Sequence, residues 1–211
     1  MKLTVIGASR GIGRKVVDYA LERGHEVRAV ARSADAMDID SDALQKIAGD
    51  ATDPQLLARA VPGADAVILT LGVPRDLRVL KPTTLFSSTA QALIPEMQAA
   101  GVKRLLAVTG FGTGDSYAKL STPEKLTFKL FLGRAYADKA LQEELIRGSG
   151  LDWTIARPGI LTDNAMTGKY QVLVTPESWR QGVISRADVA HFLVHAAEDG
   201  SHIHQTPALQ R

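Results

Sequence analysis

The hydrophobic and polar positions along the chain alternate between two patterns. Short apolar runs, typical of buried strands, are separated by longer stretches in which apolar residues recur every three or four positions, as on one face of a helix. The predicted strands are 2–6, 26–30, 45–48, 65–71, 103–108 and 152–156. The predicted helices are 12–23, 54–60, 84–100 and 134–148. This order predicts an α/β fold, with one Rossmann-type domain over 1–211 that contains a doubly wound parallel sheet and helices on both faces.

Two segments interrupt this alternation. Residues 111–133 and 161–183 are too long for plain connections, and the first of them is also unusually aromatic. Doubly wound folds bind their ligands beyond the carboxyl ends of the strands, where such insertions lie. We therefore expect both insertions on the substrate side of the sheet.

The composition narrows the class of protein. The chain has 211 residues, of which 45% are hydrophobic and 23% charged, as in ordinary globular proteins. No apolar run approaches the roughly 20 residues of a membrane span. Cysteine is absent, and the first predicted strand begins at Lys2, which leaves no room for a cleavable leader, so we expect a cytoplasmic protein. The formal charge of +2 predicts no nucleic-acid or membrane partner, and a monomer and a homodimer both stay open.

A glycine-rich turn follows the first predicted strand directly and opens the first predicted helix. Gly7 allows a sharp turn, whereas Gly11 and Gly13 allow close approach of the backbone. The N–H groups at the start of the following helix can bind a pyrophosphate. The alternative is a merely structural turn. The residues expected to contact a dinucleotide here are Gly7, Ser9, Arg10, Gly11, Ile12 and Gly13.

The end of the second predicted strand indicates which dinucleotide is bound. NAD-binding proteins usually have an acidic residue there to hold the ribose hydroxyls. This chain has Arg32 and Ser33 instead, and Arg32 and Arg10 are expected to converge on one corner. Guanidinium groups at that corner match a 2′-phosphate, which predicts NADP(H) as the cofactor. The alternative is that both arginines are solvated surface charges.

Further cofactor contacts are expected where the third and fourth predicted strands end. Asp50 could accept a hydrogen bond from the adenine amino group, and Ala51 lies beside it. Asp53 followed by Pro54 indicates an ordinary helix start. The contacts expected after the fourth strand are Thr70, Leu71 and Gly72.

The sequence resembles the short-chain dehydrogenase/reductase superfamily, and in particular its atypical, NmrA-like NAD(P)-binding branch. The motifs that carry the resemblance are GASRGIG at 7–13, GDATD at 49–53, AVILTLG at 66–72, AGVKRLLAVTG at 100–110 and SGLDWTIARPG at 149–159. Residues 167–192 are similar to the flavin reductase/biliverdin-IXβ reductase group. This resemblance implies hydride transfer from NADPH to a planar conjugated acceptor, such as a flavin, quinone or tetrapyrrole. It leaves open a redox sensor that binds NADP(H) without turnover and, as a third possibility, an enzyme like the sugar-nucleotide epimerases or dehydratases.

The resemblance also nominates catalytic residues. In much of the superfamily a tyrosine four residues before a lysine is the general acid, and the lysine holds the cofactor ribose. Here Tyr136 stands three residues before Lys139, a rotation of about 100° from the usual direction. Thr109 is the hydroxyl nearest the usual serine, whose position Gly110 takes. Thr109, Tyr136 and Lys139 are the catalytic candidates, and Thr109, Gly110 and Lys139 are also expected at the cofactor. A packed helix tyrosine is the alternative for Tyr136.

The sixth predicted strand and the insertions supply the remaining candidates. Arg157, Pro158, Gly159 and Ile160, which close this strand, are expected to line the nicotinamide. Phe111 and Trp179 are expected to enclose the planar acceptor, since aromatic faces suit such a ligand. The alternative is that Phe128, Phe131 and Trp179 fill a satellite core.

One further pattern concerns metals. His191 and His195 are spaced to share a face of a predicted helix, but the string between them lacks the glutamate of a metalloprotease motif, and no cysteine is available. We expect no metal site.

Overall fold

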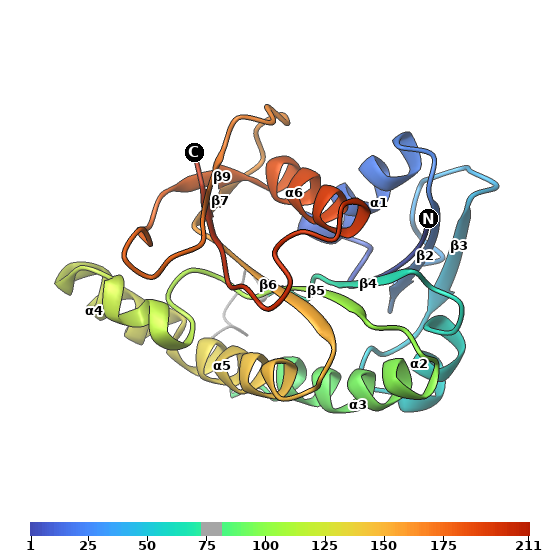
Figure 1. Cartoon of the computed structure of the whole chain (residues 1–211), viewed down its shortest axis with the longest axis horizontal. Helices are drawn as coiled ribbons and strands as arrows, with labels where there is room; N and C mark the ends of the chain where they lie inside the picture. Colours follow the sequence, from blue (N-terminus) through green and yellow to red (C-terminus); the bar gives the residue numbers. More distant parts are fainter. Residues whose placement is uncertain (73–81) are drawn as a thin grey trace.

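A mostly parallel sheet runs through the middle of the molecule (Figure 1). The computed structural model describes residues 1–72 and 82–211, without the side chains of 127–131. In this part of the chain the sheet contains β1 (Lys2–Ile6), β2 (Glu26–Ala31), β3 (Leu44–Ala48), β4 (Ala66–Leu69), β5 (Arg104–Val108), β6 (Asp152–Pro158), β8 (Gln171–Leu173) and β10 (Ala208–Gln210). Their order is β3-β2-β1-β4-β5-β6-β10-β8, so the direction of winding reverses between β1 and β4. Ligands bind at such a reversal, beyond the carboxyl ends of the strands.

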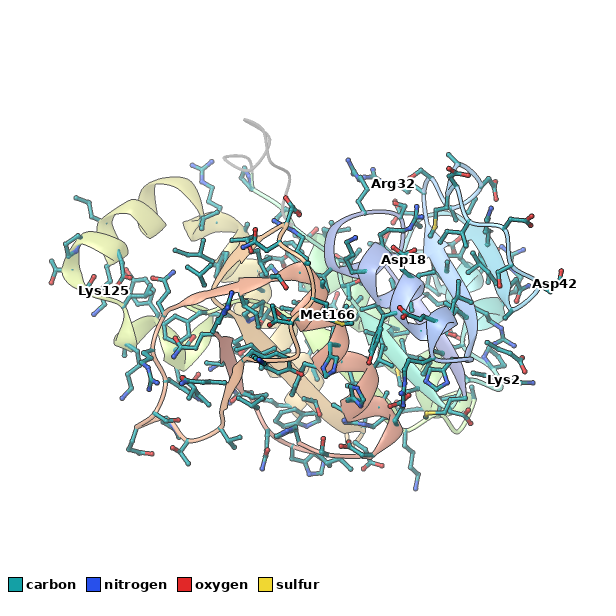
Figure 2. The ribbon with its side chains drawn as sticks, turned by 90° about the horizontal axis from the view of Figure 1, so that it is seen from above. Lys2, Asp18, Arg32, Asp42, Lys125 and Met166 are labelled. Carbon is teal, nitrogen blue, oxygen red and sulfur yellow. The ribbon has the colours of Figure 1, made fainter. Side chains whose placement is uncertain are left out.

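Helices cover both faces of the sheet (Figure 1). On one face α1 (Gly11–Glu22) lies beside α6 (Arg186–Glu198), as Figure 2 also shows from above. The other face carries α2 (Pro54–Ala60), α3 (Leu85–Ala99) and α5 (Gly133–Arg147). Each face has its own buried apolar cluster, with Val16 and Leu193 in one and Leu57, Leu93 and Ile146 in the other. The prediction of a doubly wound α/β fold is confirmed, and no helix in the described residues could cross a membrane.

The differences from the predicted elements lie mainly in the two insertions. Residues 111–133 contain a 3₁₀-helix, η2 (Gly114–Lys119), and α4 (Thr122–Phe131). Residues 161–183 run from β7 (Ile160–Thr162) through β8 to β9 (Val183–Ser185), and β7 and β9 pair with each other in parallel outside the main sheet. The pattern did not predict β10, which pairs with β6 in parallel and with β8 in the antiparallel direction. The sheet is therefore mostly, and not entirely, parallel.

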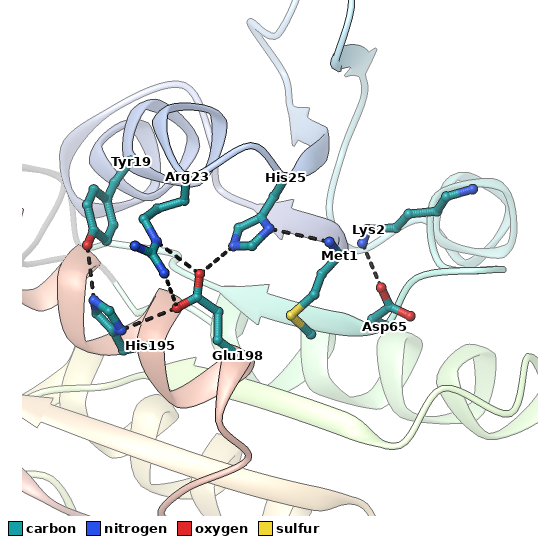
Figure 3. A network of polar contacts seen from close by, with 8 residues as sticks. All are labelled: Met1, Lys2, Tyr19, Arg23, His25, Asp65, His195 and Glu198. Atoms are coloured by element: carbon teal, nitrogen blue, oxygen red, sulfur yellow. Dashed lines mark hydrogen bonds and ion pairs between the residues drawn. The ribbon is translucent and has the colours of Figure 1, made fainter.

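A polar cluster joins the ends of α1 and α6 (Figure 3). The carboxylate of Glu198 accepts a hydrogen bond from Arg23 Nε at 3.1 Å and lies 2.7 Å from His25 Nε2. His195 Nδ1 lies 3.2 Å from the same carboxylate, and its Nε2 is 3.0 Å from the hydroxyl of Tyr19. The ring of His191 is stacked on Tyr19. His191 and His195, the two histidines considered as metal ligands, thus both contact Tyr19, and His195 also contacts Glu198.

This cluster makes stability depend on pH. Burial opposes ionisation of Glu198, but the hydrogen bonds from Arg23 and His25 outweigh it and hold the pKa of the carboxyl below its usual value of 4.5. Burial, helped by His195, lowers the pKa of His191 below 6.5. The unfolded chain then binds protons more readily at both groups, so stability falls as the pH drops below about 6.5 and falls further below about 4.5.

The variant Glu198→Gln tests the contribution of the carboxylate. We expect it to lower the melting temperature at pH 7 by about 2–4 °C, the effect of losing about 1 kcal/mol in a chain of this size once solvent screening is allowed for. Its melting temperature should also fall less than that of the wild type between pH 5.5 and 3.5. The exposed Glu22, at the end of α1, provides the control Glu22→Gln. If the melting temperatures of Glu198→Gln and the wild type fell equally over this pH range, the lowered pKa assigned to Glu198 would be contradicted.

Candidate cofactor and active site

The glycine turn after β1 folds tightly against the end of β4. Gly7 has φ +86°, and a Cβ at this residue would lie 3.0 Å from the carbonyl carbon of Thr70. A Cβ on Gly13 would overlap the carbonyl oxygen of Gly7 and lie 2.5 Å from Thr70 Oγ1. Arg10 occupies the N-cap of α1, but its side chain makes no capping hydrogen bond. The first N–H groups of α1 therefore remain available at the end of the sheet, a cradle that fits a pyrophosphate.

The end of β2 lies against this turn. Ser33 Oγ donates a hydrogen bond to Ser9 Oγ at 3.1 Å, which brings their neighbours Arg32 and Arg10 to one corner. Both arginines are exposed, and Arg32 extends from the rim of the molecule in Figure 2. Within the described residues neither guanidinium has a hydrogen-bond or ion-pair partner. The corner thus carries two positive charges that no carboxylate neutralises by direct contact.

The end of β3 adds an acidic residue near this corner. Asp50 accepts hydrogen bonds from the backbone N–H and the hydroxyl of Thr52, both at 2.9 Å. These bonds, and to a smaller extent the charge of Arg32, lower the pKa of Asp50. Ala51 beside it is buried. Asp53 accepts from the N–H of Gln55 at 2.9 Å and caps α2, so the predicted helix start is confirmed.

The ends of β4 and β6, which lie on either side of β5, complete the edge of the sheet. Thr70 Oγ1 donates to the carbonyl of Ile6 at 2.9 Å, and Leu71 and Gly72 follow where this described stretch ends. Pro158 is the last residue of β6. A Cβ on Gly159 would overlap the carbonyl oxygen of Gly182, which shows how closely the two ends of the 161–183 insertion approach each other. The next residue, Ile160, is 57% exposed.

Lys139 of α5 is directed at the end of β5. Its side chain is buried and Nζ donates to the carbonyl of Thr109 at 2.6 Å, while Nζ lies 4.7 Å from the ring centre of Phe86. Burial lowers the pKa of Lys139 to about 8, against the opposing charges of Glu143 and Asp138. In this conformation the ammonium group connects α5 to the end of β5 through the carbonyl of Thr109.

Tyr136, one helical turn away, fills the space above Gly110. A Cβ on Gly110 would overlap the hydroxyl oxygen of Tyr136, so no larger residue fits there without displacing the phenol. The hydroxyl therefore occupies the volume that a side chain at this position would take. Burial raises the pKa of Tyr136 to about 12, so the phenol keeps its proton throughout the physiological range.

Sequence reasoning missed a buried polar network behind these residues. Glu143, on α5, accepts from Thr109 Oγ1 at 2.6 Å and from Arg157 Nε at 3.0 Å. Arg157 is fully buried at the end of β6. The available signal was the face of α5 that packs inward, because four of its buried residues are polar: Asp138, Lys139, Gln142 and Glu143. Polar residues at the positions where a helix should be apolar indicate a network of this kind.

The two aromatic residues expected around the acceptor are placed differently. Phe111 is 3% exposed and Trp179 is 6% exposed, and both pack in a small cluster with Leu120 and Ala208. The guanidinium carbon of Arg157 lies 5.0 Å from the ring centre of Trp179. Both rings are buried in this arrangement and Trp179 covers a buried cation, so contact of the two rings with an acceptor stays a prediction that their packing does not favour. The packing of Trp179 agrees with the alternative interpretation, a satellite core. The side chains of Phe128 and Phe131 lie outside the described residues.

The similarity to known proteins covers nearly the whole chain. A sequence model of the NAD(P)H-binding family matches residues 7–200. The solved structure of ChuY, an anaerobillin reductase from Escherichia coli O157:H7, is 30% identical, with a TM-score of 0.82 and coverage of 100% of this chain and 97% of that one. Sanguinarine reductase from Eschscholzia californica is 28% identical over 93% of this chain and 85% of its own. The uncharacterized sugar epimerase YhfK from Bacillus subtilis (strain 168) is 27% identical over 94% of this chain and 89% of its own.

Proposed function

Because the chain belongs to the NAD(P)H-binding family, as an atypical short-chain dehydrogenase/reductase, we propose that it is an NADPH-dependent reductase of a planar conjugated acceptor. The observation that carries the choice of cofactor is the corner beside the glycine turn, where neither Arg10 nor Arg32 has a hydrogen-bond or ion-pair partner within the described chain. Relatives named as reductases of anaerobillin and sanguinarine support the type of reaction. A flavin, a quinone and a tetrapyrrole are the acceptor classes that we propose.

The proposed cofactor residues lie along the edge where the parallel strands β1 to β6 end. The turn at 7–13 would hold the pyrophosphate, and Arg10 and Arg32, with Ser9 and Ser33, the 2′-phosphate. Asp50 and Ala51 would lie at the adenine. When bound, the dinucleotide supplies the hydride at its nicotinamide end. The residues proposed to line that end are Thr70, Leu71, Gly72, Thr109, Gly110, Lys139, Pro158, Gly159 and Ile160.

The proposed chemistry of the protein consists of orientation and of one proton donor. Lys139 and Glu143, both on α5, bind the carbonyl and the hydroxyl of Thr109, which gives the floor of the site a single geometry. Tyr136 is the proposed proton donor to the reduced acceptor, because its hydroxyl lies at Gly110 and carries a proton at neutral pH, although its raised pKa makes it a weak acid. Solvent can supply this proton to acceptors whose reduced nitrogen or oxygen is exposed.

The acceptor needs an apolar surface beside Gly159. Ile160 and Val183 are paired in register on β7 and β9 and are 57% and 46% exposed. Paired residues of parallel strands point to the same side of a sheet, so these two side chains form one apolar patch. We propose this patch, in place of Phe111 and Trp179, as the surface on which the planar acceptor packs.

The test is oxidation of NADPH by the purified protein with FMN, riboflavin and menadione as acceptors. We expect turnover with at least one of them, and a slower reaction with NADH.

Tyr136→Phe should lower kcat by at least about tenfold for an acceptor that takes its proton from the phenol, with NADPH affinity unchanged. An unchanged kcat would assign the proton to solvent.

Absence of turnover with every acceptor, despite micromolar binding of NADPH, would contradict the reductase and favour a redox sensor. Capture of a protein partner that depends on NADP(H) would support the sensor further. The relative named as a sugar epimerase favours a second candidate function, which predicts interconversion of nucleotide sugars. The spacing of Tyr136 and Lys139 counts against it, since it departs from the arrangement that the related epimerases use.

A further inference from the structure

The guanidinium of Arg157 is the most deeply buried charge at the end of the sheet in the described chain. Its side chain is 0% exposed, and burying an unpaired charge is strongly unfavourable. Glu143 neutralises it through two contacts, to Nε and to Nη2. The third contact comes from the 3₁₀-helix η2, where Oδ1 of Asp115 lies 2.5 Å from Nη1.

Four charged side chains form a closed ring around this contact, which we call the charge ring. Asp115 Oδ2 lies 3.8 Å from Nη2 of Arg147, and the same nitrogen lies 3.7 Å from Oε2 of Glu143. Positive and negative groups thus alternate around Arg157, Glu143, Arg147 and Asp115. The ring joins the end of β6, helix α5 and the 3₁₀-helix η2.

The two carboxylates of the ring differ in what surrounds them. The side chain of Glu143 is 4% exposed and also accepts from Thr109, so it belongs to the core of the fold. The side chain of Asp115 is 53% exposed and belongs to residues 111–120, which we call the acceptor-side segment. Water can replace the contacts of Asp115 more easily than those of Glu143.

The acceptor-side segment rests on the ring. Gly114 lies directly above the ion pair, since a Cβ there would be 3.3 Å from Nη2 of Arg157 and 3.4 Å from Oε2 of Glu143. At its start, the N–H of Phe111 donates to the carbonyl of Pro158 at 2.9 Å. Phe111 directly follows Gly110, where the hydroxyl of Tyr136 lies. A displacement of the segment would therefore move the wall of the site next to the proposed proton donor.

We propose that Asp115 is a positioning residue for the electron acceptor. Its ion pair with Arg157 fixes the acceptor-side segment over the ends of β5 and β6, and thereby sets the space in which the acceptor packs. This inference rests on the proposed reductase function. It assigns to Asp115 a larger effect on the acceptor than on the cofactor, because the contacts proposed for the phosphates and the adenine lie elsewhere along the sheet edge.

The test compares Asp115→Asn with Asp115→Glu and with a matched control. Asp18, whose side chain is 40% exposed and pairs with Arg14 on α1, provides the control Asp18→Asn. We expect Asp115→Asn to raise KM for menadione about five- to tenfold at saturating NADPH, with kcat within about twofold. The Kd for NADPH, measured by titration without acceptor, should stay within about twofold, and Asp115→Glu should recover most of the loss in KM.

A second measurement follows the segment itself. Hydrogen exchange of the amides in 111–120, read by mass spectrometry, should be at least about tenfold faster in Asp115→Asn than in Asp18→Asn. An unchanged KM for menadione, or unchanged exchange in this segment, would overturn the proposal. Equal losses of NADPH and menadione affinity would also overturn it, because a general loosening of the fold would explain them. Absence of any wild-type turnover would instead remove the reductase function on which the proposal rests.

Discussion

Replacing Arg10 and Arg32 together by alanine is expected to weaken NADPH binding about a hundredfold and NADH binding by less than about threefold. Each charge-assisted contact to a phosphate contributes roughly 1.5–3 kcal/mol, so two contacts contribute about 3 kcal/mol or more. A difference of 1.4 kcal/mol is about tenfold in affinity. NADH lacks the 2′-phosphate, and the loss should therefore be confined to the phosphorylated cofactor.

Isothermal titration with both cofactors measures this difference. The control is Arg59→Ala with Lys103→Ala, which removes two exposed positive charges from other elements of the chain. Comparable losses for NADPH and NADH, or an effect no larger than that of the control, would show that the two arginines are surface charges without a ligand. Raising the salt concentration should weaken NADPH binding to the wild type more than to the double variant, because screening acts on the same contacts.

Much of the fold could be predicted from the sequence because its signals are local. β4 is a continuous apolar run and β1 is apolar apart from Lys2 and Thr4; from Leu3 onward both are buried on both faces, and runs of that kind have one common interpretation in an α/β chain. The turn between β1 and α1 was predictable for the same reason, since the close approach of Gly13 to the carbonyl of Gly7 lies within the turn itself, although Gly13 also meets Thr70. β10 was not predictable. Three residues define no period, and this strand exists because β6 and β8 provide partners on both sides.

The interior of the candidate site was harder to predict because its signals are not local. A glutamate on a helix and an arginine near a strand end each indicate exposed surface when taken singly. Only the packing of α5 on β6 shows that Glu143 and Arg157 neutralise one another away from water. The aromatic residues present the same difficulty, since composition does not distinguish a ring that faces a ligand from Trp179 over a buried guanidinium.

Glu143→Ala is expected to destabilise the chain by about 3–5 kcal/mol, because it leaves Arg157 buried with only the half-exposed Asp115 as a partner. The hydroxyl of Thr109 loses its acceptor in the same variant. In a chain of this size the melting temperature should fall by about 10 °C or more. Urea denaturation and thermal melts measure the loss, and Glu144→Ala provides the matched control, since Glu144 is the exposed neighbour on the same helix.

A second variant separates the charge from the packing. Glu143→Leu combined with Arg157→Met replaces the ion pair by apolar groups of similar size, a change that is often neutral or stabilising. We expect the double variant to be more stable than Glu143→Ala by at least about 2 kcal/mol, although it removes one more charged residue. If Glu143→Ala cost no more than Glu144→Ala, the guanidinium of Arg157 would have to be solvated in solution. Asp115 would then have no fixed cation to hold, and the position of residues 111–120 would need another explanation.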